Sequence, residues 1–409
     1  MKPGLERITG LLDMMARPDE AYPIIHVAGS NGKTSTSRMV MTLIGAHGLS
    51  AGLFTSPHLD AVEHRYHVNG FPMTPAEFAD AVAEIAPIVD LYEERTGDLV
   101  TYFELTAALA FAWFADRAVD VGVVETGLGG RLDATNAAIS EVAVVTTIGV
   151  EHTSYLGDTI PQIAGEKLAI LDEGAVLVTG DLVPEALAVA EARVREQEAR
   201  WLRLGEEYRV VDPRHVEGGW TLDLEGAFGA YEDLLLRIRG RHQVTNFATA
   251  VAAVEALFDR GLDEAGVREA AATVTSPGRM EIVMGDPMVL TDGAHNPQGM
   301  EALAAALEEE FPDTRWVAVM GAMADKDVPA MLGHVQGLVG EVHAAAADSP
   351  RALDAVAMAD LARERLGVDA TAHPSVAAAV AAAMGTGNPV LITGSIYVVA
   401  EARKALGVA

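Results

Sequence analysis

The chain has 409 residues, and at about 150 residues per domain this length predicts two to three domains. It carries 59 acidic against 29 basic residues, a formal net charge of −30, which argues against nucleic acid and anionic membrane surfaces as partners. Half of the residues are hydrophobic and none is cysteine, so we expect a globular protein with a large core and without disulfides or thiolate chemistry.

The beginning of the chain, MKPGLERITG, lacks the apolar stretch of a secretory signal, so we expect a cytoplasmic location. The longest stretch without charged residues, 370–400, contains prolines and glycines, which indicates a strand and loops and not a membrane span. Lysine is rare beside arginine, which favours the interpretation that the few lysines occupy positions where a compact ammonium group is needed. It occurs only at Lys2, Lys33, Lys167, Lys326 and Lys404.

From residue 22 onwards, short apolar runs alternate with longer amphipathic runs. We expect strands at residues 23–28, 119–125, 142–148, 176–179, 288–291, 316–320, 342–346 and 390–393. We expect helices at residues 34–47, 75–93, 104–115, 247–259, 297–310 and 375–384. Strands that alternate with helices predict parallel sheets covered by helices on both faces, which is an α/β fold.

Two segments interrupt this alternation. Residues 201–239 contain short alternating runs bounded by glycines, which predicts a small antiparallel patch that closes the first domain. The run TSPGRME at 275–281 follows a helical stretch and contains a Pro-Gly break. We therefore place a boundary there and predict two domains, residues 1–275 and residues 276–409.

An apolar run at residues 24–28 leads into a glycine-containing loop and then into a helix start rich in hydroxyl groups. Backbone amides in such a loop, together with the positive end of the following helix, form an anion site, and a lysine adds a charge for the outer phosphates. The spacing G-x-x-G-K-T is shorter than the general nucleotide-loop pattern, and a glycine turn with an accidental lysine is the alternative. The loop consists of Gly29, Ser30, Asn31, Gly32, Lys33, Thr34 and Ser35.

Three further polar residues follow the expected strands and helices of the first domain. Glu125 ends the strand at 119–125, and His152 follows the strand at 142–148, so both lie at the carboxyl edge of the sheet, where ligands bind in α/β proteins. Alone, a carboxylate there is often a helix cap, and a histidine is often structural. Lys167 lies on an apolar helix, where a surface lysine with a buried stem is the alternative to a functional one.

In the second domain, polar groups gather at three strand ends: residues 291–297, 324–327 and 393–397. Three such ends at one sheet edge predict a ligand crevice. Since both domains present such edges, we expect a nucleotide held between them and a hinge at residues 276–279.

The motifs together resemble the folylpolyglutamate synthase and dihydrofolate synthase family, a branch of the Mur ligase superfamily. The resemblance spans nearly the whole chain and rests on many motifs in order. They include GLERITGLL at 4–12, HVAGSNGKTS at 26–35, TSPHL at 55–59, YFELT at 102–106, ETGLGGRLDATN at 125–136, RHQVTNFATA at 241–250, DGAHNP at 292–297 and GSIYVVAEAR at 394–403.

The resemblance implies an ATP-dependent ligase of folate biosynthesis and one-carbon metabolism, with a P-loop parallel-sheet ATPase domain and a smaller, C-terminal Rossmann-like α/β domain. We expect a monomer, although the sequence itself leaves the oligomeric state open. A folate or dihydropteroate carboxylate would attack the γ-phosphate of ATP, giving an acyl phosphate and ADP. The amine of L-glutamate would then attack the acyl carbon, and phosphate would leave. Alignment and charge neutralisation serve the first step, which suits a lysine, backbone amides and Mg²⁺.

The resemblance also implies roles for single residues. One Mg²⁺ would be held by Ser56 and Glu125, and a second by His152, while Lys167 would be carbamylated into a carboxylate-like metal ligand. Lys33 and His295 would join Lys167 as catalytic residues. ATP would also be bound by Asn246, Arg279 and Asp292. The pterin acid would be bound by Glu104, Leu132 and Asp133, and glutamate by His295 and Ser395.

Some alternatives stay open. The family commonly has glycine after the loop lysine, so either Thr34 or Ser35 could face the phosphates or a metal. The acceptor could be dihydropteroate, a tetrahydrofolate or both, or a different acid in an amide ligase of the same mechanism. A binding or regulatory ATPase is disfavoured because every polar position that the ligase chemistry needs holds a competent residue.

Overall fold

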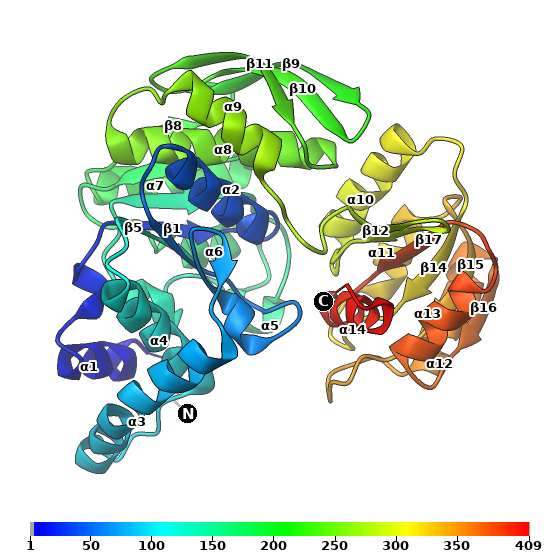
Figure 1. Cartoon of the computed structure of the whole chain (residues 1–409), viewed down its shortest axis with the longest axis horizontal. Helices are drawn as coiled ribbons and strands as arrows, with labels where there is room; N and C mark the ends of the chain where they lie inside the picture. The colour runs from blue at the N-terminus through cyan, green and yellow to red at the C-terminus, as the bar shows by residue number, and fades with distance from the viewer. Residues whose placement is uncertain (1–3, 409) are drawn as a thin grey trace. The chain divides into compact units, whose positions relative to one another are not determined.

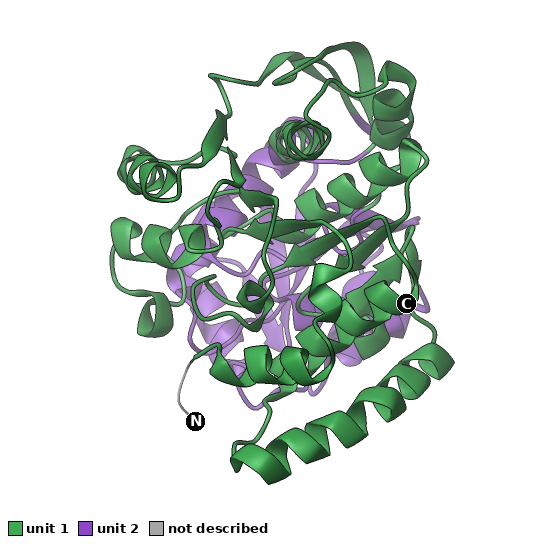
Figure 2. Cartoon of the chain, turned by 90° about the vertical axis from the view of Figure 1, so that its left-hand side faces the viewer, with its two compact units in different colours: residues 1–216, 220–237, 243–275 green, residues 217–219, 238–242, 276–409 purple. Residues whose placement is uncertain are grey.

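The structure is a computed structural model that describes residues 4–408. The chain forms two compact units (Figures 1 and 2). Unit 1 comprises residues 1–216, 220–237 and 243–275, and unit 2 comprises residues 217–219, 238–242 and 276–409. Among the described residues, no helix combines the length and the apolar character needed to cross a membrane.

Unit 1 is built on an eight-stranded sheet with the order β4-β3-β2-β5-β1-β6-β7-β8. Strands β2, β5, β1, β6, β7 and β8 run parallel, and β3 and β4 add an antiparallel edge. The strands are β1 (Ile24–Ala28), β2 (Ala51–Phe54), β3 (Tyr66–Val68), β4 (Phe71–Pro72), β5 (Val121–Glu125), β6 (Val142–Val145), β7 (Val176–Thr179) and β8 (Arg200–Arg203). The central strands β1, β5 and β6 are buried throughout, as expected for a sheet covered on both faces.

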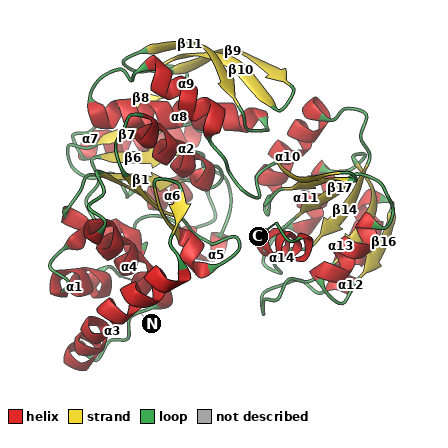
Figure 3. Ribbon diagram, in the orientation of Figure 1, coloured by secondary structure: helices red, strands yellow, loops and turns green. Residues whose placement is uncertain are grey.

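Helices cover this sheet on both faces: α1, α3 and α4 gather below the strands in the view of Figure 3, and α2 and α9 above them. The helices are α1 (Glu6–Met14), α2 (Lys33–Ala46), α3 (Pro75–Thr96), α4 (Tyr102–Asp116), α5 (Thr153–Leu156), α6 (Ile160–Leu168), α7 (Pro184–Glu196), α8 (Arg241–Phe258) and α9 (Glu264–Thr273), with single turns η1 (Pro18–Glu20), η2 (Val62–Arg65) and η3 (Ala134–Ala137). Capping boxes at Thr74, Thr101 and Thr159 fix the starts of α3, α4 and α6.

The antiparallel patch expected between residues 201 and 239 is present as a three-stranded sheet with the order β11-β10-β9. Its strands are β9 (Arg209–Val216), β10 (Gly219–Glu225) and β11 (Ala230–Leu236), and β10 and β11 pair antiparallel. Alternate residues of β10 are buried, including Trp220, Leu222 and Leu224. One face of β10 therefore packs inward, as the alternating sequence predicts.

Unit 2 has a six-stranded sheet with the order β12-β13-β17-β14-β15-β16, parallel except for the β12–β13 hairpin. The strands are β12 (Glu281–Gly285), β13 (Met288–Thr291), β14 (Trp316–Met320), β15 (Val339–Ala344), β16 (Asp369–Ala372) and β17 (Val390–Thr393). The helices are α10 (Pro297–Glu310), α11 (Val328–His334), α12 (Ala355–Leu366), α13 (Val376–Met384) and α14 (Ile396–Leu406). The predicted α/β fold is confirmed in both units.

Some predicted elements differ in extent for identifiable reasons. The strand expected at 142–148 ends at Val145, because Thr146 and Thr147 turn away to bind the loop after β1. The strand expected at 119–125 begins at Val121, because the carboxylate of Asp120 accepts hydrogen bonds from Ser50 at the start of β2. In both places, a local apolar pattern continues past the point where polar side chains make long-range contacts.

Candidate active site

The loop of residues 29–35 joins β1 to α2 and is held by the two threonines that follow β6. The Ser30 amide donates to the Thr147 carbonyl oxygen at 2.8 Å, and Thr146 Oγ1 donates to the Asn31 carbonyl oxygen at 2.6 Å. Gly29 has φ +151°, and a Cβ there would lie 2.0 Å from Thr146 Oγ1. Glycine is therefore required for the loop to approach this strand end.

Two lysine side chains converge on one carbonyl oxygen of this loop. Lys33 Nζ donates to the Gly29 carbonyl oxygen at 2.8 Å and lies 3.4 Å from that of Ser30. Lys167, on α6, donates from Nζ to the same Gly29 oxygen at 2.9 Å. Lys167 is 2% exposed, and its ammonium also forms an ion pair with Glu151 Oε1 at 2.9 Å. Lys167 is therefore a buried site residue and not a surface lysine.

This pair of buried charges shifts both protonation equilibria. Burial lowers the pKa of Lys167 to about 8, although the Glu151 carboxylate acts in the opposite direction. Burial alone would raise the pKa of Glu151, but the charges of Lys167 and Lys33 outweigh it and lower that pKa to about 2. Glu151 is thus a buried carboxylate at neutral pH, beside a lysine that loses its proton more readily than usual.

The carboxylate of Glu125 lies at the end of β5, opposite the first turn of α2. Thr34 Oγ1 lies 3.0 and 3.1 Å from its two oxygens, and the Ser56 amide lies 3.4 Å from Oε2. Ser35, in contrast, is buried, and its hydroxyl accepts a hydrogen bond from Gln243 Nε2 at 3.2 Å. Of the two hydroxyl residues left open by the sequence, Thr34 is the one beside the carboxylate.

The oxygen atoms around Glu125 suit a hard cation such as Mg²⁺, which prefers carboxylate, hydroxyl and water ligands. Glu125, Thr34 and Ser56 lie together there. His152 lies beside Glu151 instead, with Nε2 4.0 Å from Glu151 Oε2. Within residues 4–408, no group of three or more histidine, aspartate and glutamate side chains is arranged to hold a metal ion. A metal at this edge would therefore depend on hydroxyl and phosphate oxygens as well as on Glu125.

The predicted acceptor-binding residue Glu104 is used by the local structure. It is 4% exposed, completes the capping box of α4 with Thr101, and forms an ion pair with Arg7 at 2.9 Å. Leu132, on the loop after β5, is 40% exposed, as is Leu128 at 38%. The apolar side chains of this loop are accessible to a ligand, whereas the Glu104 carboxylate already has two partners.

Asp133 organises the same loop from within. Its Oδ2 accepts hydrogen bonds from the amides of Gly127 and Leu128 at 2.9 and 2.8 Å, and its Oδ1 accepts from the Thr135 hydroxyl at 2.5 Å. Burial raises the pKa of Asp133, while these hydrogen bonds oppose the rise. His26 Nε2 lies 2.8 Å from Thr135 Oγ1, which connects β1 to this loop.

Asn246 and Gln243 on α8 contact the loop of residues 29–35. A Cβ on Gly32, whose φ is +87°, would lie 2.7 Å from Asn246 Oδ1. Asn246 Nδ2 donates to Gln243 Oε1 at 3.0 Å. The sequence prediction included Asn246 but missed Gln243, which lies in the motif RHQVTNFATA, and Glu151, which directly precedes the predicted His152.

In unit 2, Asp292 follows β13 and is buried. Its carboxylate accepts hydrogen bonds from the amides of Met280 and Ala294 at 2.9 and 2.8 Å. The Arg279 guanidinium lies close to Gly293, since a Cβ there would be 1.9 Å from Nη1. The structure thus brings the predicted ATP-binding residues Arg279 and Asp292 to one turn.

The two predicted glutamate-binding residues lie at the ends of neighbouring parallel strands. His295 follows β13, and its Nδ1 lies 2.9 Å from the Gly293 carbonyl oxygen. Ser395 follows β17, is 2% exposed, and caps α14 by accepting from the Tyr397 amide. Because β13 pairs with β17, both residues lie at the carboxyl edge of this sheet, as the sequence predicts.

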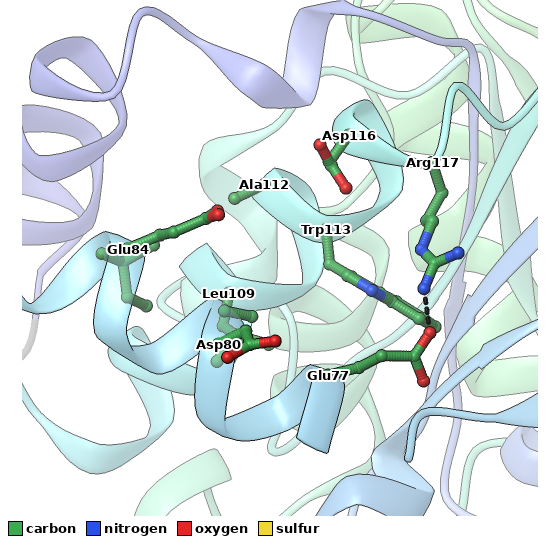
Figure 4. Close-up of a pocket in the computed structure, with 10 residues that line it drawn as sticks. Glu77, Asp80, Glu84, Leu109, Ala112, Trp113, Asp116 and Arg117 are labelled. Atoms are coloured by element: carbon green, nitrogen blue, oxygen red, sulfur yellow. Dashed lines mark hydrogen bonds and ion pairs between the residues drawn. The ribbon is translucent and has the colours of Figure 1, made fainter. Parts of the chain in front are cut away.

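A hollow of about 210 Å³ between α3 and α4 lies outside these groups (Figure 4). Its lining includes Glu77, Asp80, Glu84 and Asp116, and Arg117 forms an ion pair with Glu77. None of the candidate site residues lines it. This acidic hollow is therefore lined by residues other than those of the candidate site.

A parallel-sheet unit with a glycine- and lysine-containing loop beside a buried carboxylate, followed by a second α/β unit, is the arrangement expected of an ATP-dependent ligase of the Mur type. Two family descriptions match in that order: the Mur ligase middle domain at residues 27–254, and the glutamate ligase domain of Mur ligases at residues 278–396. The chain belongs to the dihydrofolate synthase/folylpolyglutamate synthase family of these ligases.

Membership rests on similarity over the full length. A dihydrofolate synthase/folylpolyglutamate synthase of Mycobacterium tuberculosis is 38% identical, over 99% of this chain and 90% of that protein. The crystal structure of M. tuberculosis folylpolyglutamate synthase complexed with ADP and AMPPCP superposes with a TM-score of 0.95 at 39% identity, covering 99% and 96% of the two chains. Escherichia coli FolC in complex with DHPP and ADP gives 0.88 at 31% identity, covering 100% and 94%.

Proposed function

We propose that the enzyme couples dihydropteroate, a tetrahydrofolate or both to the amine of L-glutamate and converts ATP to ADP and phosphate. The observation that carries the proposal is the loop of residues 29–35, with Lys33 at the start of α2 and the Thr34 hydroxyl beside the buried carboxylate of Glu125. The names of the relatives, and the DHPP and ADP in the E. coli structure, support the choice of substrates.

In the proposed first step, an oxygen of the acceptor carboxylate attacks the γ-phosphorus of ATP, and the bond to the β-γ bridging oxygen breaks. The loop amides and Lys33 offset the charge on the transferred phosphoryl group. Lys33 must exchange its contacts with the Gly29 and Ser30 carbonyl oxygens for phosphate oxygens. Asn246, Arg279 and Asp292 bind the nucleotide in this proposal.

In the second step, the neutral amine of glutamate attacks the acyl carbon, and phosphate leaves from a tetrahedral intermediate. His295 and Ser395 bind the incoming glutamate, and Glu104, Leu132 and Asp133 form the acceptor side. For Glu104 and Asp133, we propose that the carboxylates shape the acceptor site through the loop and helix start that they hold.

Two Mg²⁺ ions complete the proposed site. Thr34, Ser56 and Glu125 would hold the first ion, and His152 the second. When bound, the metal supplies positive charge to the phosphate oxygens and so favours the attack of the acceptor carboxylate. We also propose that residues 1–275 form the ATP-binding domain and residues 276–409 the glutamate ligase domain, and that the enzyme acts as a monomer in the cytoplasm. The two compact units and the two family matches support this division.

We propose that Lys167 is carbamylated, since a buried lysine with a pKa of about 8 has an unusually large neutral fraction near pH 7. The amine nitrogen attacks CO2 and loses a proton, which replaces the ammonium by an anionic carbamate. At a fixed CO2 concentration, we expect carbamate occupancy and activity to rise between about pH 7 and about pH 9, because the amine loses its proton in this window. Carbon-13 NMR with labelled bicarbonate measures the occupancy. A signal that persists in Lys167→Arg, or none in the wild type, contradicts this assignment.

The proposed reaction is tested by measuring ADP release from the purified enzyme. We expect release that depends on both the acceptor and glutamate, and extension of dihydropteroate or tetrahydrofolate by labelled glutamate. ADP formation that is indifferent to both substrates would indicate a plain ATPase. Glutamate-dependent turnover with an unrelated acid, and none with any pterin acid, would indicate a Mur-type amide ligase with another acceptor.

A further inference from the structure

Arg65, the last residue of η2, is a buried cation whose contacts are all with uncharged groups. Its side chain and backbone together are 6% exposed. Nε donates to His58 Nδ1 at 3.1 Å, Nη1 donates to Ser56 Oγ at 3.2 Å, and Cζ lies 5.7 Å from the centre of the Tyr102 ring. Within residues 4–408, Arg65 forms no ion pair with a carboxylate.

The neighbouring histidine does not provide the missing negative charge. Its Nδ1 accepts the hydrogen bond from Arg65 Nε, so the ring acts towards Arg65 as a hydrogen-bond acceptor and not as a counter-ion. A guanidinium has five N–H donors in a planar fork, and these contacts use only two of them. A buried, permanently charged group without a counter-charge is costly, and this cost is offset when an anionic ligand binds the free side of the fork.

The position of Arg65 identifies which anion fits. On one side, Ser56 links the guanidinium to Glu125, a proposed Mg²⁺ ligand, because the Ser56 amide lies 3.4 Å from Glu125 Oε2. Tyr102 connects it to the start of α4, two residues before Glu104, and is 59% exposed. The nucleotide phosphates already have the loop amides and Lys33 as donors. Arg65 therefore lies between Ser56, which is next to Glu125, and Tyr102 at the start of α4.

We propose that Arg65 binds the carboxylate of the acceptor, the group that becomes the acyl phosphate, and that it fixes this carboxylate for attack on ATP. This assignment rests on the proposed function and adds a residue to it. His58 is a positioning residue, since its Nδ1 holds Nε and leaves the three remaining N–H groups of the Nη atoms to the ligand. A bidentate pair between a guanidinium and a carboxylate gives the directional hold that an in-line attack requires.

The test compares the wild type with Arg65→Gln in the full-length enzyme. We expect the KM for the pterin acid that the wild type extends to rise about 10- to 100-fold, the loss expected for a charged hydrogen bond. The dissociation constant of ADP and the Tm should stay close to wild-type values. The acceptor KM of Arg65→Lys should lie between those of the wild type and Arg65→Gln, because lysine keeps the positive charge and loses the planar pair of donors. His58→Gln should raise the same KM by a smaller factor.

A second measurement removes the ligand's charge instead of the protein's. The wild type should bind the acceptor acid more tightly than its primary carboxamide, and Arg65→Gln should bind both about equally. Arg193→Gln is the matched control, since Arg193 is an arginine of α7 that donates to the Leu171 carbonyl oxygen and to Glu196. It should leave the acceptor KM and the acid-to-carboxamide preference unchanged.

The outcomes separate this proposal from the proposed function. If the wild type extends a pterin acid and Arg65→Gln keeps both its KM and its preference for the acid, the assignment of Arg65 is overturned and the function stands. An equal loss of ADP affinity also overturns it, because the anion would then be a phosphate. If Arg65→Gln does not fold, the acid-to-carboxamide preference of Arg65→Lys is measured instead. An unchanged preference overturns the assignment, and a weakened preference supports it. If the wild type extends no pterin acid, the proposed function itself is overturned.

Discussion

Replacing Lys33 by alanine is expected to lower kcat for acceptor-dependent ADP formation on the order of 10³-fold. The Lys33 ammonium lies at the start of α2, beside the loop that is proposed to bind phosphate, and it contacts the carbonyl oxygens of Gly29 and Ser30. Those oxygens can be hydrated when the side chain is removed, and Lys167 Nζ still donates to the Gly29 oxygen. The loop should therefore keep its shape while the phosphoryl group loses a compensating charge.

The measurement is steady-state kinetics at saturating MgATP, together with the Tm of each variant. Lys404→Ala is the matched control, because it removes the same side chain from the last turn of α14. The control should have wild-type kcat, and both variants should unfold near the wild-type Tm. Near-wild-type turnover by Lys33→Ala would contradict the assignment of the phosphate loop.

The strand–loop–helix arrangement around residues 29–35 could be predicted because its signal is local. An apolar strand, two glycines, a lysine and a hydroxyl-rich helix start occupy consecutive positions, and β1, the loop and α2 have this order in the structure. The carboxyl edge of the sheet was equally predictable, since parallel strands place Glu125 on the same edge as the loop. Neither inference requires a contact between distant residues.

The sequence could not predict which side chains pair with each other when they lie far apart in the chain. Glu151 becomes a site residue because α6 brings Lys167 to it, and Gln243 becomes one because α8 brings it to Ser35. Neither pairing has a periodicity or a spacing that a single sequence reveals. Strand β2 was missed for a related reason: AGLF is short and contains glycine, and only its parallel pairing with β5 stabilises it.

Two carboxylates show a further limit of predicting function from residue type. Glu104 and Asp133 are buried acids in motifs of the expected acceptor site, and the fold already uses both carboxylates. Glu104 accepts from the Thr101 amide and pairs with Arg7, and Asp133 accepts from two loop amides and the Thr135 hydroxyl. Sequence alone cannot separate a carboxylate that binds a ligand from one that holds a helix start or a loop. Arg65 is the opposite case. Its hydrogen-bond partners in the fold are uncharged, so its positive charge is available to an anionic ligand.

Replacing Glu125 by glutamine is expected to lower kcat at least about 100-fold at low millimolar Mg²⁺ and to raise the Mg²⁺ concentration needed for half-maximal activity. Glutamine has nearly the same volume, and its carbonyl oxygen can still accept from the Thr34 hydroxyl, so the local packing should persist. The substitution removes the negative charge that, in the proposed site, holds the hard cation beside Ser56. Titration of activity with Mg²⁺ at fixed ATP measures the effect.

The control is Glu255→Gln, which changes another fully buried carboxylate of unit 1. Glu255 accepts from the Tyr231 hydroxyl at 2.7 Å and from the Ala227 amide at 2.7 Å, so its loss should lower stability and leave the Mg²⁺ dependence unchanged. If both variants lose activity only in proportion to their loss of Tm, Glu125 is a structural carboxylate. If Glu125→Gln keeps its Tm and recovers activity at high Mg²⁺, its negative charge acts on the metal, because added cation can restore occupancy but cannot repair a damaged fold.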